Sequence, residues 1–271
     1  LAKAAETLAG QFTLVATNVP YLGRGKQDEV LKEFCERVYP EAKADLATCF
    51  VERGLDFCSS NGSVALVTPQ NWLFLGTYRQ LRKSKLTQNR WNSVVRLGAK
   101  AFQTPMWDFN VCLVTISRQQ PAIASEFPGW EVSELTDPEA KAESLRTAAP
   151  SISQQESQLR NPDHRVSLGK LDDKPLLAQL AVSLQGTTTG DNPKFLAQFW
   201  ELPSAGSNWD FFQGAVSAVQ DFGGCESVVR WEQGAGDLSR SDEARVQGLA
   251  AFGRRGLVVS QMGALPATQY G

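Results

Sequence analysis

Residues 12–17, Phe-Thr-Leu-Val-Ala-Thr, followed at once by Asn18-Val19-Pro20-Tyr21, form the stretch that decides the fold. The first six residues are mostly apolar or β-branched, which is typical of a strand buried on both faces of a sheet. Pro20 cannot continue a central ladder, so the strand is predicted to end here. Because ligands bind at the carboxyl ends of parallel strands, the tetrapeptide is a candidate site.

Helical and strand patterns alternate along the next hundred residues. Apolar residues recur at helical spacing in 27–38 and 44–58, and Ser60-Asn61-Gly62 is a turn signal. The segments that follow are a strand at 63–67, a helix at 71–86, and strands at 93–97 and 110–116. This alternation predicts an α/β layered sheet, in which right-handed crossovers make the first strand pairs parallel.

The second half of the chain has a different composition. Residues 137–173 are polar and are broken by three prolines, which indicates a linker or a loosely packed excursion. Beyond it, 184–271 is rich in Gly and Trp, with short candidate strands at 227–231 and 256–260. We therefore predict domains at 1–135 and 181–271, separated by residues 136–180.

Composition excludes several classes of protein. The 271 residues carry a formal net charge of -2, with 42% hydrophobic and 21% charged residues, as in a soluble globular protein. There is no uninterrupted apolar run of eighteen residues and no signal-peptide pattern, so no membrane association is expected. Five cysteines without a Cys-x-x-Cys pair, and the single His164, provide no metal site. A reduced, cytoplasmic setting fits best.

One short window is strongly basic. It contains no acidic residue, and its cations are Arg79, Arg82, Lys83, Lys85, Arg90, Arg96 and Lys100. Such a run can contact phosphates without sequence specificity, but it is equally typical of a solvated helix face.

The strand-end tetrapeptide and the segments after it resemble the amino-methyltransferases of DNA, whose fourth motif reads Asn-Pro-Pro-Tyr. The further matching segments, in chain order, are 43–46 with Phe50, 64–69 with 72–74, 101–102 ahead of the strand at 111–116, and then 183–186, 189–192, Phe195 and 265–268. Their order most resembles the long adenine-N6 methyltransferases of bacteriophage-exclusion systems and of fused restriction-modification enzymes.

The resemblance implies a partial Rossmann-like methyltransferase sheet over 1–135, followed by the start of a mixed α/β target-recognition region over 181–271. The implied reaction transfers a methyl group from S-adenosylmethionine to the N6 amine of an adenine flipped out of double-stranded DNA. Restriction or defence-system subunits are possible further partners. The alternative is a non-catalytic DNA-binding or regulatory module that keeps the fold without methyl transfer.

The resemblance also assigns roles to individual residues. The side-chain oxygen of Asn18 and the backbone carbonyl of Val19 would accept hydrogen bonds from the target amine. Tyr21 would stack on the flipped base, with Phe102 on its other face. Val19 replaces the first proline of the motif, but Pro20 biases Val19 toward the same extended conformation. Apart from the resemblance, Arg24 and Lys26 lie in a loop with two glycines that could hold phosphates beside the flipped base; the alternative is a flexible surface loop.

The main binding motif for S-adenosylmethionine is a glycine-rich turn after an earlier strand, and no such turn precedes Phe12. We therefore expect this segment to be a fragment, or a relic without its cofactor half, and to bind the cofactor poorly by itself. An α/β enzyme of other chemistry would need a nucleophile or metal set, which the single histidine and scattered cysteines do not supply.

Overall fold

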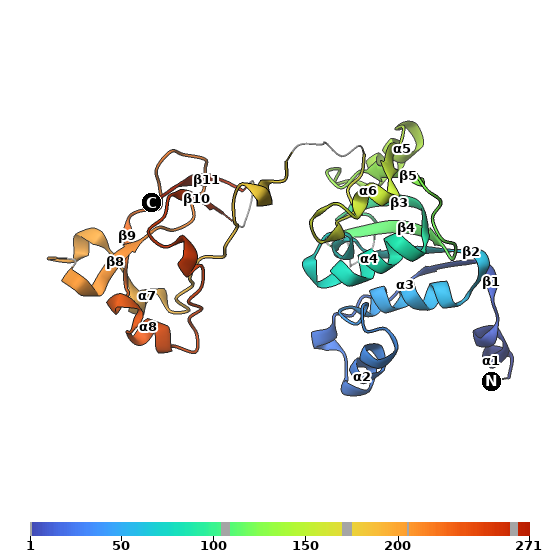
Figure 1. The fold of residues 1–271 in the computed structure, drawn as a ribbon, viewed down its shortest axis with the longest axis horizontal. Helices are drawn as coiled ribbons and strands as arrows, with labels where there is room; N and C mark the ends of the chain where they lie inside the picture. The colour runs from blue at the N-terminus through green and yellow to red at the C-terminus, as the bar shows by residue number, and fades with distance from the viewer. Residues whose placement is uncertain (1, 104–108, 170–174, 205, 261–264) are drawn as a thin grey trace. The chain divides into compact units, whose positions relative to one another are not determined.

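The computed structural model describes residues 2–103, 109–169, 175–204, 206–260 and 265–271. The chain forms two compact units, Leu1–Asp173 and Lys174–Gly271, each of which is described by itself (Figure 1).

Unit 1 is built on a six-stranded mixed sheet in the order β1-β2-β4-β3-β5-β6. The strands are β1 Phe12–Asn18, β2 Cys58–Pro69, β3 Arg90–Gly98, β4 Val111–Ser117, β5 Glu126–Glu131 and β6 Ser151–Gln154. β1 pairs with β2 in parallel, as predicted, and β3 pairs with β5 in parallel. β4 is antiparallel to both β2 and β3, so the carboxyl ends of β1, β2, β3 and β5 lie at one edge of the sheet.

The described part of the first hundred residues contains four α-helices, and two of them begin at an aspartate cap. The four helices are α1 Ala2–Ala9, α2 Glu29–Val38, α3 Leu46–Asp56 and α4 Arg79–Gln88. Asp28 caps α2 by accepting from the Leu31 N–H, and Asp45 caps α3 by accepting from the Ala47 N–H. α3 packs on β2, and α2 lies on the far side of α3 from the sheet (Figure 1).

The main core of unit 1 lies between the sheet and its helices. Trp72 and Trp91 are fully buried with ring centroids 5.6 Å apart, and Phe127 lies 5.9 Å from Trp91. These rings join the turn after β2 to β3 and β5. Such close aromatic contacts add to the stabilisation that burial of the rings provides.

The prediction that the first strand is buried on both faces is wrong. Only Val15 is half-buried and Val19 buried; Leu14 is 60% exposed. Within the described residues β1 pairs with β2 alone and forms an edge of the sheet, so its apolar side chains remain in solvent. Composition reports that a segment can be buried, but not which strands flank it.

The helix predicted at 71–86 is interrupted in its first half. Two short 3-10 turns, η2 Gln70–Leu73 and η3 Gly76–Tyr78, precede α4. Trp72 is buried and its indole N–H donates to Thr68 Oγ1 at 3.0 Å, which fixes the turn against β2. Gly76 then lowers the helix propensity of the segment, so the regular helix begins at Arg79.

Residues 136–173, predicted as a linker or excursion, belong to unit 1 where they are described. They form α5 Pro138–Thr147, β6 and α6 Gln155–Gln158, and β6 pairs antiparallel with β5. Gln155 is 1% exposed, and its amide nitrogen donates to the carbonyls of Leu86 and Asn89, at 2.7 Å each. Some of the polar side chains of this segment are therefore buried and hydrogen-bonded, and the boundary between the units lies at 173/174.

Unit 2 consists of short elements. Its helices and strands are α7 Asn192–Phe195, β7 Leu196–Gln198, β8 Trp209–Phe212, β9 Ser227–Arg230, α8 Asp237–Arg240, β10 Gly256–Val259 and β11 Ala267–Tyr270. β9 lies between β7 and β8 in an antiparallel sheet, and β10 pairs antiparallel with β11. The strands predicted at 227–231 and 256–260 thus correspond to β9 and β10.

Candidate active site

Asn18 is the last residue of β1 and lies at the carboxyl edge of the sheet. Its register partner in the parallel ladder is Val67 of β2. The Asn18 side chain is exposed, whereas Val19 directly after it is 4% exposed and belongs to the core. Burial of Val19 fixes the backbone on which Asn18 and Val19 present their oxygens.

Tyr21 folds back on Asn18. The Tyr21 hydroxyl donates to Asn18 Oδ1 at 3.3 Å, and the half-buried ring packs on the small cluster formed by Leu97, Val111 and Val132. Burial raises the pKa of Tyr21 to about 12, with smaller contributions from Cys112 and Asp45. The phenol is therefore protonated at neutral pH and acts as a donor toward Asn18.

Asp45 anchors the loop that follows Tyr21. Its carboxylate accepts from the Leu22 N–H at 3.3 Å and from the Ala47 N–H at 2.8 Å. The Leu46 N–H donates to the Leu22 carbonyl at 3.0 Å. Both backbone polar groups of Leu22 are thus hydrogen-bonded to the start of α3. Asp45 lies in the segment 43–46 that resembles a family motif, but its helix cap was not predicted, although an Asp directly before an apolar helical pattern is a recognised cap signal.

Arg24 and Lys26, predicted to contact phosphates, lie in the 3-10 turn η1 Arg24–Lys26. Arg24 forms an ion pair with Glu36 of α2 at 2.8 Å. Glu36 also pairs with Lys43, and the two cations, Lys43 foremost, lower the pKa of the Glu36 carboxyl. Arg24 is thus tied to α2, whereas Lys26 is exposed at the end of the turn.

The aromatic ring that contacts Tyr21 is Phe109. The two ring centroids are 6.1 Å apart and the planes are tilted by 54°. Phe102, predicted from the sequence to stack opposite Tyr21, is 40% exposed, and Phe109 is 51% exposed. Both belong to the connection from β3 to β4, of which 104–108 lie outside the described residues. Sequence reasoning missed Phe109, the second phenylalanine of the same connection.

The basic window does not form a single stripe. Arg82 is 0% exposed, and Lys85 is 5% exposed and paired with Glu52 at 2.7 Å. Arg96 pairs with Glu131 at 3.0 Å. None of these three residues is a free cation on a solvated helix face: Arg82 and Lys85 lie on the side of α4 that packs against the rest of unit 1, and Arg96 lies on strand β3 beside Glu131 of β5. The outward residues of α4 include Arg79 and Lys83.

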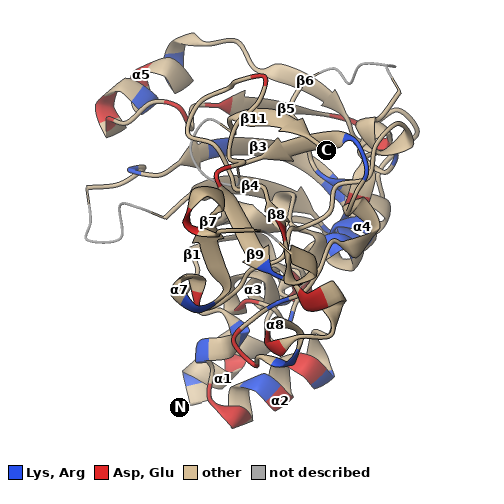
Figure 2. Cartoon of the chain, turned by 90° about the vertical axis from the view of Figure 1, so that its left-hand side faces the viewer, with Lys and Arg blue, Asp and Glu red and all other residues tan. Residues whose placement is uncertain are grey.

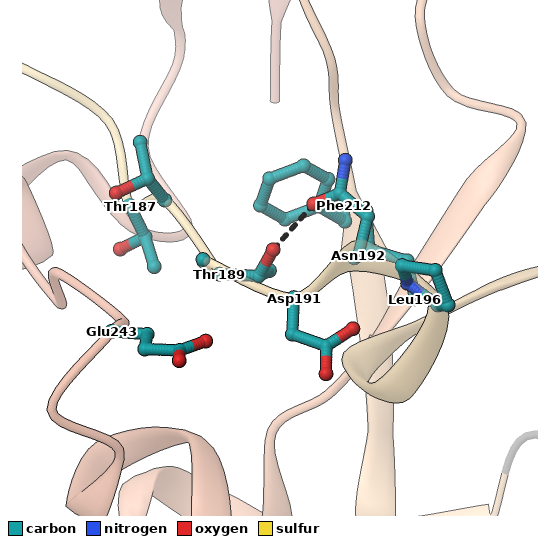
Figure 3. Close-up of a pocket in the computed structure, with 10 residues that line it drawn as sticks. Thr187, Thr189, Asp191, Asn192, Leu196, Phe212 and Glu243 are labelled. Atoms are coloured by element: carbon teal, nitrogen blue, oxygen red, sulfur yellow. Dashed lines mark hydrogen bonds between the residues drawn. The ribbon is translucent and has the colours of Figure 1, made fainter.

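A separate cavity of about 580 Å³ lies in unit 2 (Figure 3). It is lined by residues 187–193, which include the segment 189–192 that resembled the recognition region, together with Leu196, Phe212 and Glu243. The Thr189 hydroxyl hydrogen-bonds with Asn192 Oδ1, and Asp191 caps α7. Gly190 has φ +73°, and a Cβ there would lie 2.5 Å from the Glu243 carbonyl oxygen. Glycine is thus required for this turn.

Within the described ranges, no group of three or more His, Cys, Asp or Glu side chains could hold a metal ion. Within the same ranges, no helix has the length and apolar character needed to cross a membrane.

Comparison with known proteins gives matches in the N-terminal part of the chain. Residues 2–102 match the family described as Eco57I restriction-modification methylase. Over 105 residues the chain is 33% identical to the adenine-specific methyltransferase PglX of Lacticaseibacillus casei (strain Zhang), covering 38% of this chain and 8% of PglX. Over 95 residues it is 35% identical to the adenine-specific methyltransferase BrxX of Escherichia coli O9:H4 (strain HS), covering 35% of this chain and 8% of BrxX.

The matches thus span 8% of the length of each of these relatives. Among solved structures, a nuclease-deletion mutant of the Type ISP restriction-modification enzyme LlaGI, in complex with a DNA substrate mimic, superposes with a TM-score of 0.45 at 12% identity. That superposition covers 60% of this chain and 19% of LlaGI. The resemblance to the adenine-specific methyltransferases of restriction-modification and phage-defence systems, predicted from Asn18–Tyr21 and the motifs after it, is confirmed over residues 2–102.

Proposed function

We propose that unit 1 carries the target-base side of the active site of an S-adenosylmethionine-dependent DNA methyltransferase that acts on adenine N6. The observation that carries this proposal is the position of Asn18. Asn18 is exposed at the carboxyl edge of the sheet, directly before the buried Val19, and its side-chain oxygen lies within hydrogen-bond distance of the Tyr21 hydroxyl. The family match over residues 2–102 and the two adenine-specific relatives support the choice of substrate.

In this proposal Asn18 and Val19 orient the target amine. The amine of adenine is a weak nucleophile because its lone pair is delocalised into the ring. Asn18 Oδ1 and the Val19 carbonyl accept hydrogen bonds from its two N–H groups. This arrangement favours a pyramidal nitrogen whose lone pair can attack the methyl group. Fixed acceptors act here through orientation and electrostatic preorganisation, so neither a metal nor a strong base is needed before transfer.

When no base is bound, the Tyr21 hydroxyl donates a hydrogen bond to Asn18 Oδ1. An incoming adenine N6–H would displace this donor, or would share the oxygen through its second lone pair. The Tyr21 ring then stacks on the base, and a second ring from the connection between β3 and β4 covers the other face. Phe109 and Phe102 are the candidates for that ring. Stacking contributes about 1–3 kcal/mol per base, which offsets part of the cost of base flipping.

S-adenosylmethionine supplies the methyl group in this proposal, but no residue of the chain is assigned to it. The nucleotide site of a Rossmann-like sheet uses a glycine-rich loop after one strand and an acidic side chain, which binds the ribose, at the end of the next. The described loop after β1 contains Gly23 and Gly25, but β2 ends in Thr68-Pro69 and has no acidic side chain there. Among the described residues, this arrangement does not fit the nucleotide site of a Rossmann-like sheet. We therefore derive only the handling of the target base from this chain.

Within the same proposal, unit 2 begins the region that recognises double-stranded DNA, and its loop 187–193 forms part of that region. The parent protein would act in the cytoplasm, where its DNA substrate lies. Restriction or defence-system subunits are further candidate partners, by analogy with the systems to which the matching family refers.

The test is transfer of labelled methyl from S-adenosylmethionine to duplex DNA by the full-length protein that contains this chain. Asn18→Ala is expected to lower the transfer rate about 100- to 1000-fold, as removal of one preorganised hydrogen-bond partner does. Tyr21→Ala should weaken transfer, and Tyr21→Phe should retain it, because the ring is kept.

Asn61→Gly is the matched control, because Asn61 lies at the start of β2, at the opposite edge of the sheet, and has φ +65°, a conformation glycine adopts readily. Full transfer by Asn18→Ala would refute the proposed site. DNA binding without methylation by the unaltered protein would instead favour the non-catalytic DNA-binding module.

A further inference from the structure

A group of exposed cations lies on α4 and on the turn η4 Pro162–His164 packed against it. Arg79 and Lys83 are one helical turn apart on the outward side of α4. Arg165 follows η4 directly, and its side chain is 53% exposed. We call these three residues the α4 basic face; Figure 2 shows the concentration of lysine and arginine along α4.

An acidic residue holds two of the three cations in a defined arrangement. Asp163 lies between two of them, with Arg79 at 3.9 Å on one carboxylate oxygen and Arg165 at 3.6 Å on the other. These pairs are long and exposed, so they contribute little to stability. Their effect is to keep two guanidinium groups beside each other at the surface, where a stronger anion can replace the shared carboxylate.

A buried charge lies beneath this face. The Arg82 guanidinium is 0% exposed, and its hydrogen bonds go to backbone carbonyls of Trp72, Leu75, Asp163 and His164. Burial lowers the pKa of Arg82 to about 10, which leaves it charged at neutral pH. Its hydrogen-bond partners are carbonyls, and the carboxylate that acts on its charge, Asp163, is shared with Arg79 and Arg165, so this group of residues remains net positive at the surface.

Arg82 also fixes the backbone that presents Arg165. Asp163 and His164 both have positive φ, 53° and 54°, which is uncommon for residues other than glycine. Their carbonyls accept from Arg82 Nε at 3.2 and 3.1 Å. The strained turn is thus held against α4 by the same buried group that adds to the local charge.

The position of this face relates it to the candidate site. β2 ends at Pro69 on the carboxyl edge of the sheet that also carries Asn18, and η2 and η3 lead from Pro69 to Arg79. Asp163 approaches this connection, with its carboxylate 3.7 Å from the Cβ position of Gly76. The basic face thus begins at the edge where the target base would be held.

We propose that the α4 basic face binds the sugar–phosphate backbone of duplex DNA beside the flipped base. The proposal rests on the proposed function for the identity of its partner. Since the whole chain has a formal net charge of -2, general attraction of DNA to the protein is not expected, and binding has to come from a local group of cations. Phosphate contacts of this kind position the duplex and read no sequence.

The experiment measures binding of a fluorescein-labelled duplex to the 271-residue chain by anisotropy, between 50 and 200 mM salt as a rough working range for counterion release. The double variant Arg79→Gln with Lys83→Gln is compared with the control Lys3→Gln with Arg146→Gln, which removes the same charge from exposed positions on α1 and α5. The α4 variant is expected to lower the slope of log affinity against log salt by about 1.8, about 0.9 for each lost phosphate contact. At the lower salt concentration its affinity should fall at least tenfold more than that of the control.

Equal losses in the two double variants, or no binding of the duplex by the unaltered chain at the lower salt concentration, would overturn the proposal. Its failure is distinguishable from failure of the proposed function. Methyl transfer by the full-length protein with an unchanged salt slope in the α4 variant would refute the basic face alone. A reduced slope without any methyl transfer would support the basic face and refute the enzyme.

Discussion

Units 1 and 2 differ in how much of their surface they bury. In unit 1, strands of 4 to 12 residues enclose a main cluster that contains two tryptophans and Phe127, all fully buried. In unit 2 the strands have three or four residues, and the cluster of buried apolar residues described there consists of Phe195, Val229 and Leu238.

The exposed residues show the same difference. Unit 2 presents several large apolar side chains to solvent, such as Phe211 at 75%, Phe222 at 74% and Leu257 at 68% exposure. Because burial of apolar surface is the main favourable term in folding, unit 1 should hold most of the stability of the chain. The catalytic proposal therefore concerns the well-packed unit, whereas the region proposed for DNA recognition is expected to have the lower local stability.

The largest expected effect is that of Arg82→Met, which tests whether the packing of unit 1 depends on its buried charge. The substitution keeps much of the side-chain volume but leaves four backbone carbonyls without their donor. We expect the free energy of unfolding of unit 1 to fall by about 3–5 kcal/mol. Urea denaturation monitored by tryptophan fluorescence measures this free energy of unfolding. Lys83→Met, at the next and exposed position, should change it by less than about 0.5 kcal/mol.

Gln155→Leu tests whether the polar segment after residue 136 belongs to unit 1. The change removes the acceptor of the Trp91 N–H, at 3.0 Å, and the donor to two buried carbonyls. We expect a loss of about 2–3 kcal/mol from the free energy of unfolding of unit 1. Gln154→Leu, at an exposed neighbouring position, serves as the control. Equal stabilities of the two variants would show that α6 does not contribute to the core.

Hydrogen exchange compares the units directly. Amides of β2, β3 and β4 should exchange at least about tenfold more slowly than those of β8 and β9, because local opening is easier where fewer apolar contacts are broken. A tenfold ratio corresponds to about 1.4 kcal/mol of opening free energy. Mass spectrometry of peptides after deuterium labelling gives both rates in one experiment. Protection that is uniform across the chain would remove the contrast between the units.

The smallest expected effect concerns alkaline pH. The folded-state pKa of Tyr21 is about 12, above its ordinary value of 10.0, because burial disfavours the charged phenolate. The stabilisation associated with this shift is fully present below pH 10 and is lost as pH rises toward 12. Spectrophotometric titration should show one fewer high-pKa tyrosine in Tyr21→Phe than in the unaltered chain. Tyr78, also raised to about 12, provides the internal reference. Ionisation of Tyr21 near pH 10 would contradict a half-buried ring.

Local patterns predicted many elements of unit 1, since β2, β3, β4, α2 and α3 overlap the expected segments. They failed where neighbours in space decide the outcome. The strand β1 has an apolar sequence, yet Leu14 is exposed because β1 lies at an edge of the described sheet. Gln155 has a polar side chain, yet it is buried because it accepts from Trp91 and donates to two carbonyls.

The candidate site was predicted in part. Asn18 and Tyr21 lie within hydrogen-bond distance, but their roles in methyl transfer stay a prediction. Phe109 was missed, and Asp45 was noted only as part of the segment 43–46, because each acts through a tertiary contact, the first with the Tyr21 ring and the second with the Leu22 N–H. The ion pair between Arg24 and Glu36 could not be predicted from their spacing in the sequence, because it depends on how α2 packs beside the loop.

The measurement that tests the central claim most directly is the identity of the methylated nucleoside. Plasmid DNA from cells that express the full-length protein, unaltered or with Asn18→Ala, would be digested to nucleosides and analysed by liquid chromatography with mass spectrometry. The account predicts N6-methyldeoxyadenosine with the unaltered protein and its loss with Asn18→Ala. N4-methyldeoxycytidine in its place, or an undiminished amount of N6-methyldeoxyadenosine with Asn18→Ala, would contradict it.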